Sequence, residues 1–269
     1  GGASNPSTVA NYSTLPDPNR PFLFDEETVE GGEVGIKASL LGGKLTGDLT
    51  AYRYNYDGLQ VQTFDATTTS FFTQNAGGSR NQGIEGKIRF RASQDMTLRL
   101  AASYADLKFT DFDGAQCYAG QTVLPVAAPG TTKTPGACYS TGVGTGKARY
   151  MTGLRYGPAP FQAIVGVSYE TPISSDWAVG FTVDGYIYNK TPAWQIPYSP
   201  GQVAHDIVNA SLRLSRLDDS WQFALIATNL FDSNWHPPAT TDKPLGTAGD
   251  IMADSPVPRL VTLQATFRF

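Results

Sequence analysis

The chain has 269 residues, of which only 16% are charged, and its 20 Lys and Arg against 24 Asp and Glu give a formal net charge of −4. The charges are spread along the sequence without a basic stripe, which argues against nucleic acid as a partner. With 28 glycines and 12% aromatic residues, the composition fits strands that have one apolar face and are joined by many turns.

No apolar run reaches the roughly 18 residues that a membrane helix needs. Residues 1–26 are rich in Pro, Asn and Ser, which predicts a loop, and they lack the basic and apolar regions of a signal peptide. If the protein is exported, we expect its signal to lie before Gly1.

Alternation of apolar and polar residues begins at residues 33–40 and predicts a strand there. The dipeptide Gly42-Gly43 predicts a tight turn, and the return strand is expected over residues 44–64. The apolar phase of this return strand shifts after Ala51, where we expect a β-bulge.

The same alternation continues to the last residue of the chain. Every odd position from Val261 to Phe269 is apolar and every even position is polar, as in a strand whose two faces meet different media. The whole pattern predicts about nine strands, over approximately residues 33–40, 44–64, 70–92, 96–109, 161–170, 177–188, 208–215, 221–227 and 259–269.

The connections between these strands alternate between short and long. Tight turns are expected at residues 42–43, 93–95, 174–176 and 218–220. Long connections are expected near residues 111–159, 189–204 and 231–258. Strands of roughly ten residues joined in this way are typical of an outer-membrane barrel, with short periplasmic turns and long extracellular loops. We therefore predict an all-β fold, an antiparallel transmembrane β-barrel, rather than a soluble sandwich.

Bacterial barrels close on themselves with an even number of strands. About nine strands therefore predict that at least one more strand precedes Gly1, with residues 1–26 as the remainder of an extracellular loop and the strands within residues 27–269. The second face of the strands carries charge almost throughout, which predicts a lumen that is wet or filled by a polar plug. The charged residues expected to face the lumen or the plug are Glu85, Arg89, Arg99, Asp184 and Arg213.

Five short stretches follow one another in a fixed order, namely Gly31–Lys37, Asn75-Ala76-Gly77 with Gly83–Gly86, Asn229–Asp232, Pro258-Arg259 and the terminal Phe269. In this order the chain resembles the C-terminal part of the barrel of the TonB-dependent outer-membrane receptors. The likeness covers nearly the whole sequence and departs at Trp235, where the family often has Tyr. The resemblance implies the last nine or so strands of a barrel of roughly 22 strands. The plug domain and the energy-coupling box of the family are not found in these residues.

The resemblance also implies a function. It implies a receptor in the outer membrane of a Gram-negative bacterium that takes up a scarce nutrient, such as a ferric siderophore, by energised transport. The implied partners are outer-membrane lipid, the protein's own N-terminal plug domain and upstream strands, the TonB complex, the barrel-assembly machinery and a small-molecule ligand. Phe269 would then be the assembly signal. The alternatives are a passive porin-like channel and a surface adhesin. No nucleophile elbow, HExxH motif or Walker loop occurs, so we predict neither enzymatic activity nor a cofactor or metal site.

Both cysteines, Cys117 and Cys138, fall in the first long connection, which is expected to be extracellular. An oxidising compartment favours a structural disulfide between them over a metal or redox pair. Aromatic side chains of the loops are the candidate ligand contacts, namely Tyr118, Tyr139, Trp194 and Tyr198. For Trp194 and Tyr198 a position at the outer membrane interface is an equally good interpretation.

Overall fold

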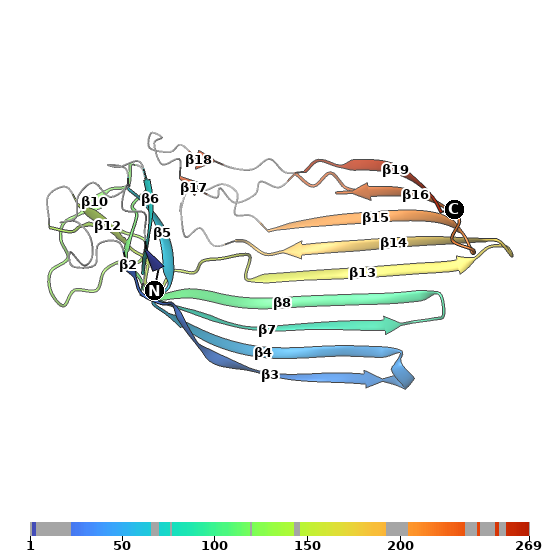
Figure 1. The fold of residues 1–269 in the computed structure, drawn as a ribbon, viewed down its shortest axis with the longest axis horizontal. Coiled ribbons are helices and arrows are strands. Elements are labelled where there is room, and N and C mark those ends of the chain that lie inside the picture. The colour runs from blue at the N-terminus through green and yellow to red at the C-terminus, as the bar shows by residue number, and fades with distance from the viewer. Residues whose placement is uncertain are drawn as a thin grey trace.

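In the computed structural model, nine antiparallel strands form one sheet (Figure 1). The structure describes residues 2–3, 23–65, 70–75, 77–118, 120–142, 146–191, 204–234, 241–242, 251–252 and 257–268. The strands of the sheet, in chain order, are β3 (Thr28–Leu40), β4 (Leu45–Asp57), β7 (Gly78–Arg91), β8 (Met96–Asp111), β13 (Phe161–Pro172), β14 (Trp177–Tyr188), β15 (His205–Arg216), β16 (Trp221–Thr228) and β19 (Leu260–Phe267). All nine predicted strands are confirmed.

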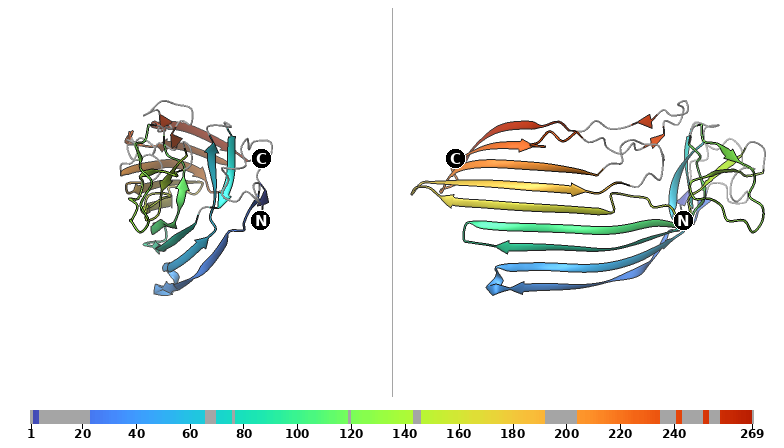
Figure 2. Two further views of the ribbon diagram at one scale, coloured as in Figure 1. Left: turned by 90° about the vertical axis from the view of Figure 1, so that its left-hand side faces the viewer. Right: turned by 180° about the vertical axis from the view of Figure 1, so that it is seen from behind.

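Neighbours in this sheet follow one another along the chain, so β13 pairs with β8 across the first long connection. The nine strands lie side by side, with the short turns at one end and the small strands β5, β6, β10 and β12 at the other (Figure 1). Viewed along the strands, the sheet is curved (Figure 2). Within the described residues it is open, with β3 and β19 at its two edges.

The strand register separates the side chains into an apolar face and a polar face. Leu40, Leu45, Phe90 and Leu98 are paired in one line across β3, β4, β7 and β8, and the residues in phase with them form what we call the outward face. Many outward side chains are exposed, as Val34 is at 75%. Contiguous exposed apolar surface of this extent is what a strand presents to lipid. We call the other side of the sheet the polar face.

The predicted bulge near Ala51 is wrong. Pairing of β4 with both β3 and β7 runs without a shift from one end of the strand to the other. Tyr52, Tyr54 and Tyr56 belong to the polar face, and the outward positions beyond Ala51 change to polar residues. The apparent phase shift is therefore a change in the surroundings of the outward face, not a slip of the backbone. The irregularity lies on the next strand, where the β7–β8 register shifts between Gly78 and Ser79.

Two strands that we predicted as single long elements are each divided. The chain leaves β4 at Gly58, whose φ of 67° belongs to the left-handed region that glycine adopts without steric cost. It then forms a separate hairpin, β5 (Gln60–Asp65) and β6 (Ser70–Asn75), before it enters β7. Residues 44–64 and 70–92 thus supply two strands of the main sheet and a hairpin above it.

The four tight turns are stabilised locally. The short 3-10 helix η3 (Leu41–Gly43) joins β3 to β4. Ser93 Oγ and Ser174 Oγ each accept a hydrogen bond from the backbone N–H three residues later, at 3.0 and 3.1 Å. The Asp218 carboxylate accepts hydrogen bonds from the hydroxyl and the backbone N–H of Ser220, at 2.6 and 3.0 Å. These two bonds hold the pKa of Asp218 below its ordinary value, because they favour the charged carboxylate.

We predicted a long connection without strands after β8, but this segment contains regular structure. Four short strands, β9 (Asp113–Ala115), β10 (Val123–Leu124), β11 (Cys138–Ser140) and β12 (Lys147–Tyr150), form a sheet in the order β10-β11-β12-β9. Phe109, Phe112 and Met151 are buried together, and Leu59 and Val61 from the β4–β5 segment pack against them. We call this assembly, formed by the described residues of 58–75 and 109–156, the loop layer. The remaining short strands are β1 (Gly2–Ala3), β2 (Leu23–Phe24), β17 (Thr241–Asp242) and β18 (Ile251–Met252).

Close packing over one glycine of β7 gives a testable consequence. A Cβ atom at Gly83 would lie 2.3 Å from the carbonyl oxygen of Tyr104 and 2.7 Å from the hydroxyl oxygen of Tyr52. We expect Gly83→Ala to lower the free energy of unfolding by about 1–3 kcal/mol, the usual cost of overpacking. The matched control is Gly32→Ala, where a Cβ meets nothing within 4 Å and the change should stay within about 0.5 kcal/mol.

Urea unfolding of the full-length protein in lipid vesicles measures both changes. Equal stability of the two variants would contradict the packing argument.

Candidate functional site

The polar face of the sheet carries all five of the predicted lumen residues. The strand register places all five on the side of the sheet opposite to the outward face. They are Glu85 and Arg89 on β7, Arg99 on β8, Asp184 on β14 and Arg213 on β15. This face is hollowed between β3 and β14. The hollow measures about 700 Å³, and its charged lining is Lys37, Asp48, Lys87, Arg89, Arg99 and Asp184.

Arg99 and Asp184 form an ion pair that spans three strands. Arg99 on β8 and Asp184 on β14 both face Gly166 on the strand between them, β13. The guanidinium Nη2 reaches Asp184 Oδ1 at 2.9 Å. A Cβ at Gly166 would lie 2.4 Å from that same oxygen, so only glycine leaves room for the two side chains to meet over the middle strand.

A second ion pair has the same construction one strand further along. Glu170 on β13 and Arg213 on β15 both face Gly180 on β14, and their side chains meet over it. A Cβ at Gly180 would lie 3.3 Å from both charged ends. At least one partner of each pair is more than a third exposed in the described sheet, so we assign the pairs little stability and regard them as fixing side-chain positions.

The other two predicted lumen residues are not brought into such pairs. Arg89 lies directly opposite Arg99 on the neighbouring strand, and Glu85 lies opposite Ser103. Neither forms an ion pair with another described residue. An ion pair between two adjacent strands lies beside them, with Lys87 Nζ 3.3 Å from Asp48 Oδ2. The polar face is therefore a wall of fixed charges of both signs.

The disulfide between Cys117 and Cys138 is confirmed. Their Cα atoms are 5.7 Å apart, the two cysteines have a sequence separation of 21, and Cys138 is fully buried. Cys138 begins β11, so the bridge attaches the segment after β9 to the small sheet. It thereby fixes the part of the loop layer that contains the longest irregular stretch.

The two described candidate tyrosines are packed beside cations of the loop layer. The guanidinium carbon of Arg149 lies 5.3 Å from the ring centre of Tyr118, and Lys133 Nζ lies 5.8 Å from that of Tyr139. Arg149 is buried, which lowers its pKa, and its Nε donates a hydrogen bond to the carbonyl oxygen of Gly136 at 3.0 Å. Both rings thus help to hold the loop layer, and a role in ligand binding stays a prediction.

Asn229 organises the base of the last long connection. Its side-chain oxygen accepts a hydrogen bond from the backbone N–H of Ser233 at 2.8 Å, and its amide nitrogen donates to the carbonyl oxygen of Val257 at 3.0 Å. The Asp232 carboxylate accepts a bond from the N–H of Arg259 at 2.9 Å. This motif therefore ties the two ends of the 231–258 connection together, which is a structural role.

Several other candidates lie outside the described residues, namely Trp194, Tyr198 and Phe269. In the described part of the chain, no group of three or more His, Cys, Asp and Glu side chains is arranged to hold a metal ion. Nor does that part contain a helix long and apolar enough to cross a bilayer.

Sequence reasoning missed Glu170, Arg149 and the two bridging glycines. Gly166 and Gly180 stand at polar-phase positions of their strands, where a charged or polar side chain is otherwise usual. Glycine inside a strand often marks a place where another group approaches closely. That signal could have located the bridges, although not the partners that cross them.

The sheet and its two faces define the class of the protein. Long antiparallel strands with an apolar outward face, a charged opposite face, short turns at one end and a folded loop layer at the other form the wall of an outer-membrane β-barrel. A family model described as TonB dependent receptor-like, beta-barrel, matches residues 2–230. The chain belongs to this family, whose barrels lie in the outer membrane of Gram-negative bacteria.

Solved structures show the same fold. The FrpB iron transporter from Neisseria meningitidis has 13% identity and a TM-score of 0.56, over 90% of this chain and 31% of that one. BauA, the ferric preacinetobactin receptor from Acinetobacter baumannii, has 16% identity and a TM-score of 0.57, over 99% and 32%. The copper transporter OprC has 14% identity and a TM-score of 0.56, over 95% and 33%. The chain thus spans about a third of the length of these relatives. A comparison with curated proteins gave no match.

The disulfide gives a prediction for the loop layer. Replacing both cysteines by serine should lower the free energy of unfolding by about 3 kcal/mol, because the unfolded chain regains the entropy that a bridge across a loop of this size removes in the chain-entropy model. Trypsin can cut this segment after Lys133. We expect the cut to be faster in the Cys117→Ser/Cys138→Ser variant than in the parent, because the bridge no longer restrains residues 118–137.

Mass spectrometry of the digest of the full-length protein locates the cuts, and the unheated gel mobility reports whether the barrel is folded. Equal cleavage rates in the two proteins would show that the bridge does not order the loop layer.

Proposed function

We propose that this chain is part of the barrel of a receptor that binds a metal chelate, first of all a ferric siderophore, at the cell surface and imports it by TonB-dependent transport. The observation that carries the proposal is the wall of fixed charges on the polar face. Such a face suits contact with water or with a polar plug domain, and it does not suit contact with lipid. The family supports the transport class. Similar structures are named as iron and copper transporters, which supports a metal as the transported species.

Within this proposal each surface has a role. The polar face contacts the plug domain, with Glu85, Arg89, Arg99, Asp184 and Arg213 as docking residues. The loop layer presents the ligand-capturing surface, and Tyr118 and Tyr139 with Trp194 and Tyr198 are its candidate contacts. The TonB complex acts on the plug from the periplasm. Ordering of the loop layer by the disulfide supports this assignment, because a preorganised surface loses less conformational entropy on binding.

The two alternatives predict different energy requirements. Cells that express the full-length receptor should bind a labelled ferric siderophore from a test panel in the cold, and accumulate it on warming. Accumulation should fall to background in a strain that lacks TonB, while cold binding persists. A passive channel would still accumulate the chelate without TonB, and an adhesin would accumulate none in either strain. Either of these outcomes would reject energised transport.

A second prediction concerns assembly. The family resemblance assigns the terminal Phe269 to the signal read by the barrel-assembly machinery, and the outward neighbours Phe267 and Leu263 extend the same face. Deleting Phe269 should lower the amount of folded receptor in the outer membrane severalfold. The measurement is a quantitative immunoblot of unheated outer-membrane fractions at modest expression. Unchanged levels would remove the assembly role.

A further inference from the structure

Beyond the apolar part of the outward face, toward the loop layer, the side chains become cationic. Arg80 on β7 and Lys108 on β8 are directly paired, and Lys108 is bridged in turn to Arg155. Arg53 on β4 stands one outward row closer to the apolar part, in line with Gln82 and Asp106. The four cations come from four neighbouring segments of chain. We call Arg53, Arg80, Asp106, Lys108 and Arg155 the outward cationic cluster.

One buried carboxylate organises this cluster. Asp106 is 7% exposed, and its Oδ1 lies 2.9 Å from Nε of Arg155. Its Oδ2 lies 3.6 Å from Nζ of Lys108 and 3.7 Å from Nη2 of Arg80. The three cations are each more exposed than the carboxylate that holds them. Asp106 therefore holds the three cations in place, and each of their side chains remains partly exposed.

The positive charge of the cluster exceeds what Asp106 can neutralise. Lys108 and Arg155 face each other directly across a strand pair, where like charges are unfavourable. One carboxylate against three cations leaves two positive charges, and Arg53 adds a third. Two further outward acids lie near the cluster: Glu30 is on the same row as Arg80 but separated from it by the whole of β4, and Asp57 is one row closer to the loops. Among the described residues, neither forms an ion pair with a cation of the cluster. If neutralising Asp106 were the only purpose, a single cation would serve.

The height of the cluster places it at the membrane interface. Ala51, Ile84, Tyr104 and Phe161 form the last apolar row of the outward face, and Tyr104 is the interfacial aromatic of this row. The next two outward rows rise by about 7 and 13 Å, since two residues of a strand advance about 6.7 Å. They carry the cations. The polar headgroup region beyond the hydrocarbon is about 5–7 Å thick on each side, so the cluster begins within it.

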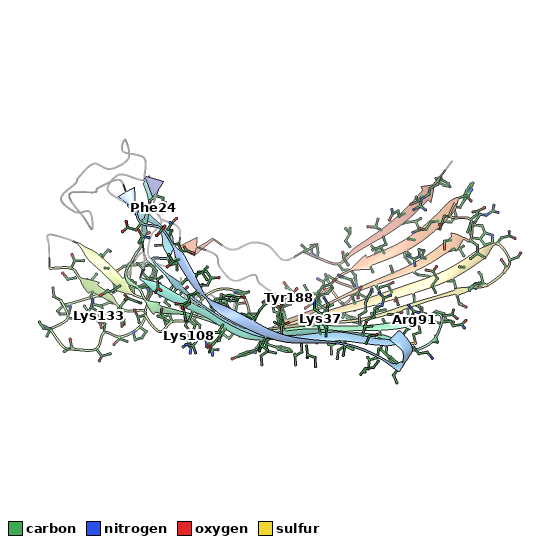
Figure 3. All side chains as sticks on the ribbon, turned by 60° about the horizontal axis from the view of Figure 1, so that its bottom comes forward. Phe24, Lys37, Arg91, Lys108, Lys133 and Tyr188 are labelled. Carbon is green, nitrogen blue, oxygen red and sulfur yellow. A yellow bond between two sulfur atoms is a disulfide. The ribbon has the colours of Figure 1, made fainter. Side chains whose placement is uncertain are left out.

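Both the side and the direction are set by the fold. The rows lie at the loop end of the strands, which is the extracellular end in a barrel with short periplasmic turns. Lys108 is on the opposite face of the sheet from Lys37 and Tyr188, which belong to the polar face (Figure 3). The cluster thus points away from the lumen and toward the outer leaflet.

We propose that the outward cationic cluster binds a phosphorylated lipid headgroup of the outer leaflet. The charged ends of Arg53, Arg80, Lys108 and Arg155 take the phosphate oxygens, and Asp106 keeps three of these cations gathered when no lipid is bound. Arginine is suited to this role because its planar guanidinium can donate two parallel hydrogen bonds to a phosphate. The apolar row below receives the acyl chains of the same lipid.

The test uses the full-length receptor purified in a neutral detergent and titrated with bisphosphorylated lipid A or with its dephosphorylated form, with binding read by native mass spectrometry. The variant Arg53→Gln/Lys108→Gln leaves Arg80 and Arg155 to hold Asp106. The matched control, Lys44→Gln/Lys147→Gln, removes the same charge from exposed lysines of a periplasmic turn and of β12. A surface cation near an anionic lipid contributes roughly fivefold to binding, so the cluster variant should bind phosphorylated lipid A about 25-fold more weakly.

The control variant and Lys108→Arg should bind the phosphorylated lipid within about twofold of the parent. Equal affinity of the cluster variant and the parent, or equal affinity of the parent for the two lipid forms, would overturn the proposal. Inorganic phosphate at 10 mM is added in a further arm. If it displaces lipid A completely, the cluster is a site for a free anion and not for a lipid. Should the double variant fail to fold, Arg53→Gln alone decides, because Arg53 takes no part in the ion pairs of Asp106 and its loss should still cost about fivefold.

Discussion

The constraint on which this structure depends is that no backbone N–H or C=O can be left unpaired in hydrocarbon. Continuous antiparallel pairing from β3 to β19 meets that requirement and, in doing so, fixes which side chains share a row. Because the side-chain period is two, a slip of one residue would send charges into lipid and leucines into the lumen. The register is therefore specified twice, once by the hydrogen bonds and once by the partition of the side chains.

On the polar face the same register determines which charges can meet. Arg99 and Asp184 lie on strands separated by one other strand, and so do Glu170 and Arg213. A side chain on the strand between would keep the two partners apart. A glycine on the strand between removes the obstacle in both cases. Each pair thus depends on the identity of a residue that carries no charge. The result is a polar face on which the side chains of Arg99 and Arg213 are directed along the sheet toward their partners.

Much of this arrangement could be predicted from the sequence, because alternation is a local signal. The nine strands, the four tight turns and the polar phase of Arg89 or Arg213 follow from the residues alone. The bulge near Ala51 was wrong because a change from apolar to polar outward residues looks like a change of phase. The hairpin β5–β6 and the loop layer were not predicted, since their burial depends on the packing of Leu59 and Val61 against the cluster of Phe109, Phe112 and Met151, which is far away in the sequence.

The ion-pair partners were beyond prediction for a related reason. Glu170 and Asp184 are both acids at polar-phase positions, and only the register across three strands decides which arginine each one meets. Asp106 is a further case. It is the next outward residue after Tyr104, so the alternation predicts that it faces lipid. Its row also contains Gln82 on β7, and this pairing shows that the strand has already left the hydrocarbon there.

The loop layer has a consequence of a different kind. An apolar centre of Phe109, Phe112 and Met151, a small sheet and an internal disulfide hold the loop layer together, and of that centre only Phe109 belongs to a strand of the main sheet. Substitutions on its exposed side can therefore accumulate without disturbing strand pairing. The surface above the sheet can thus vary in sequence while the paired strands below it stay constant.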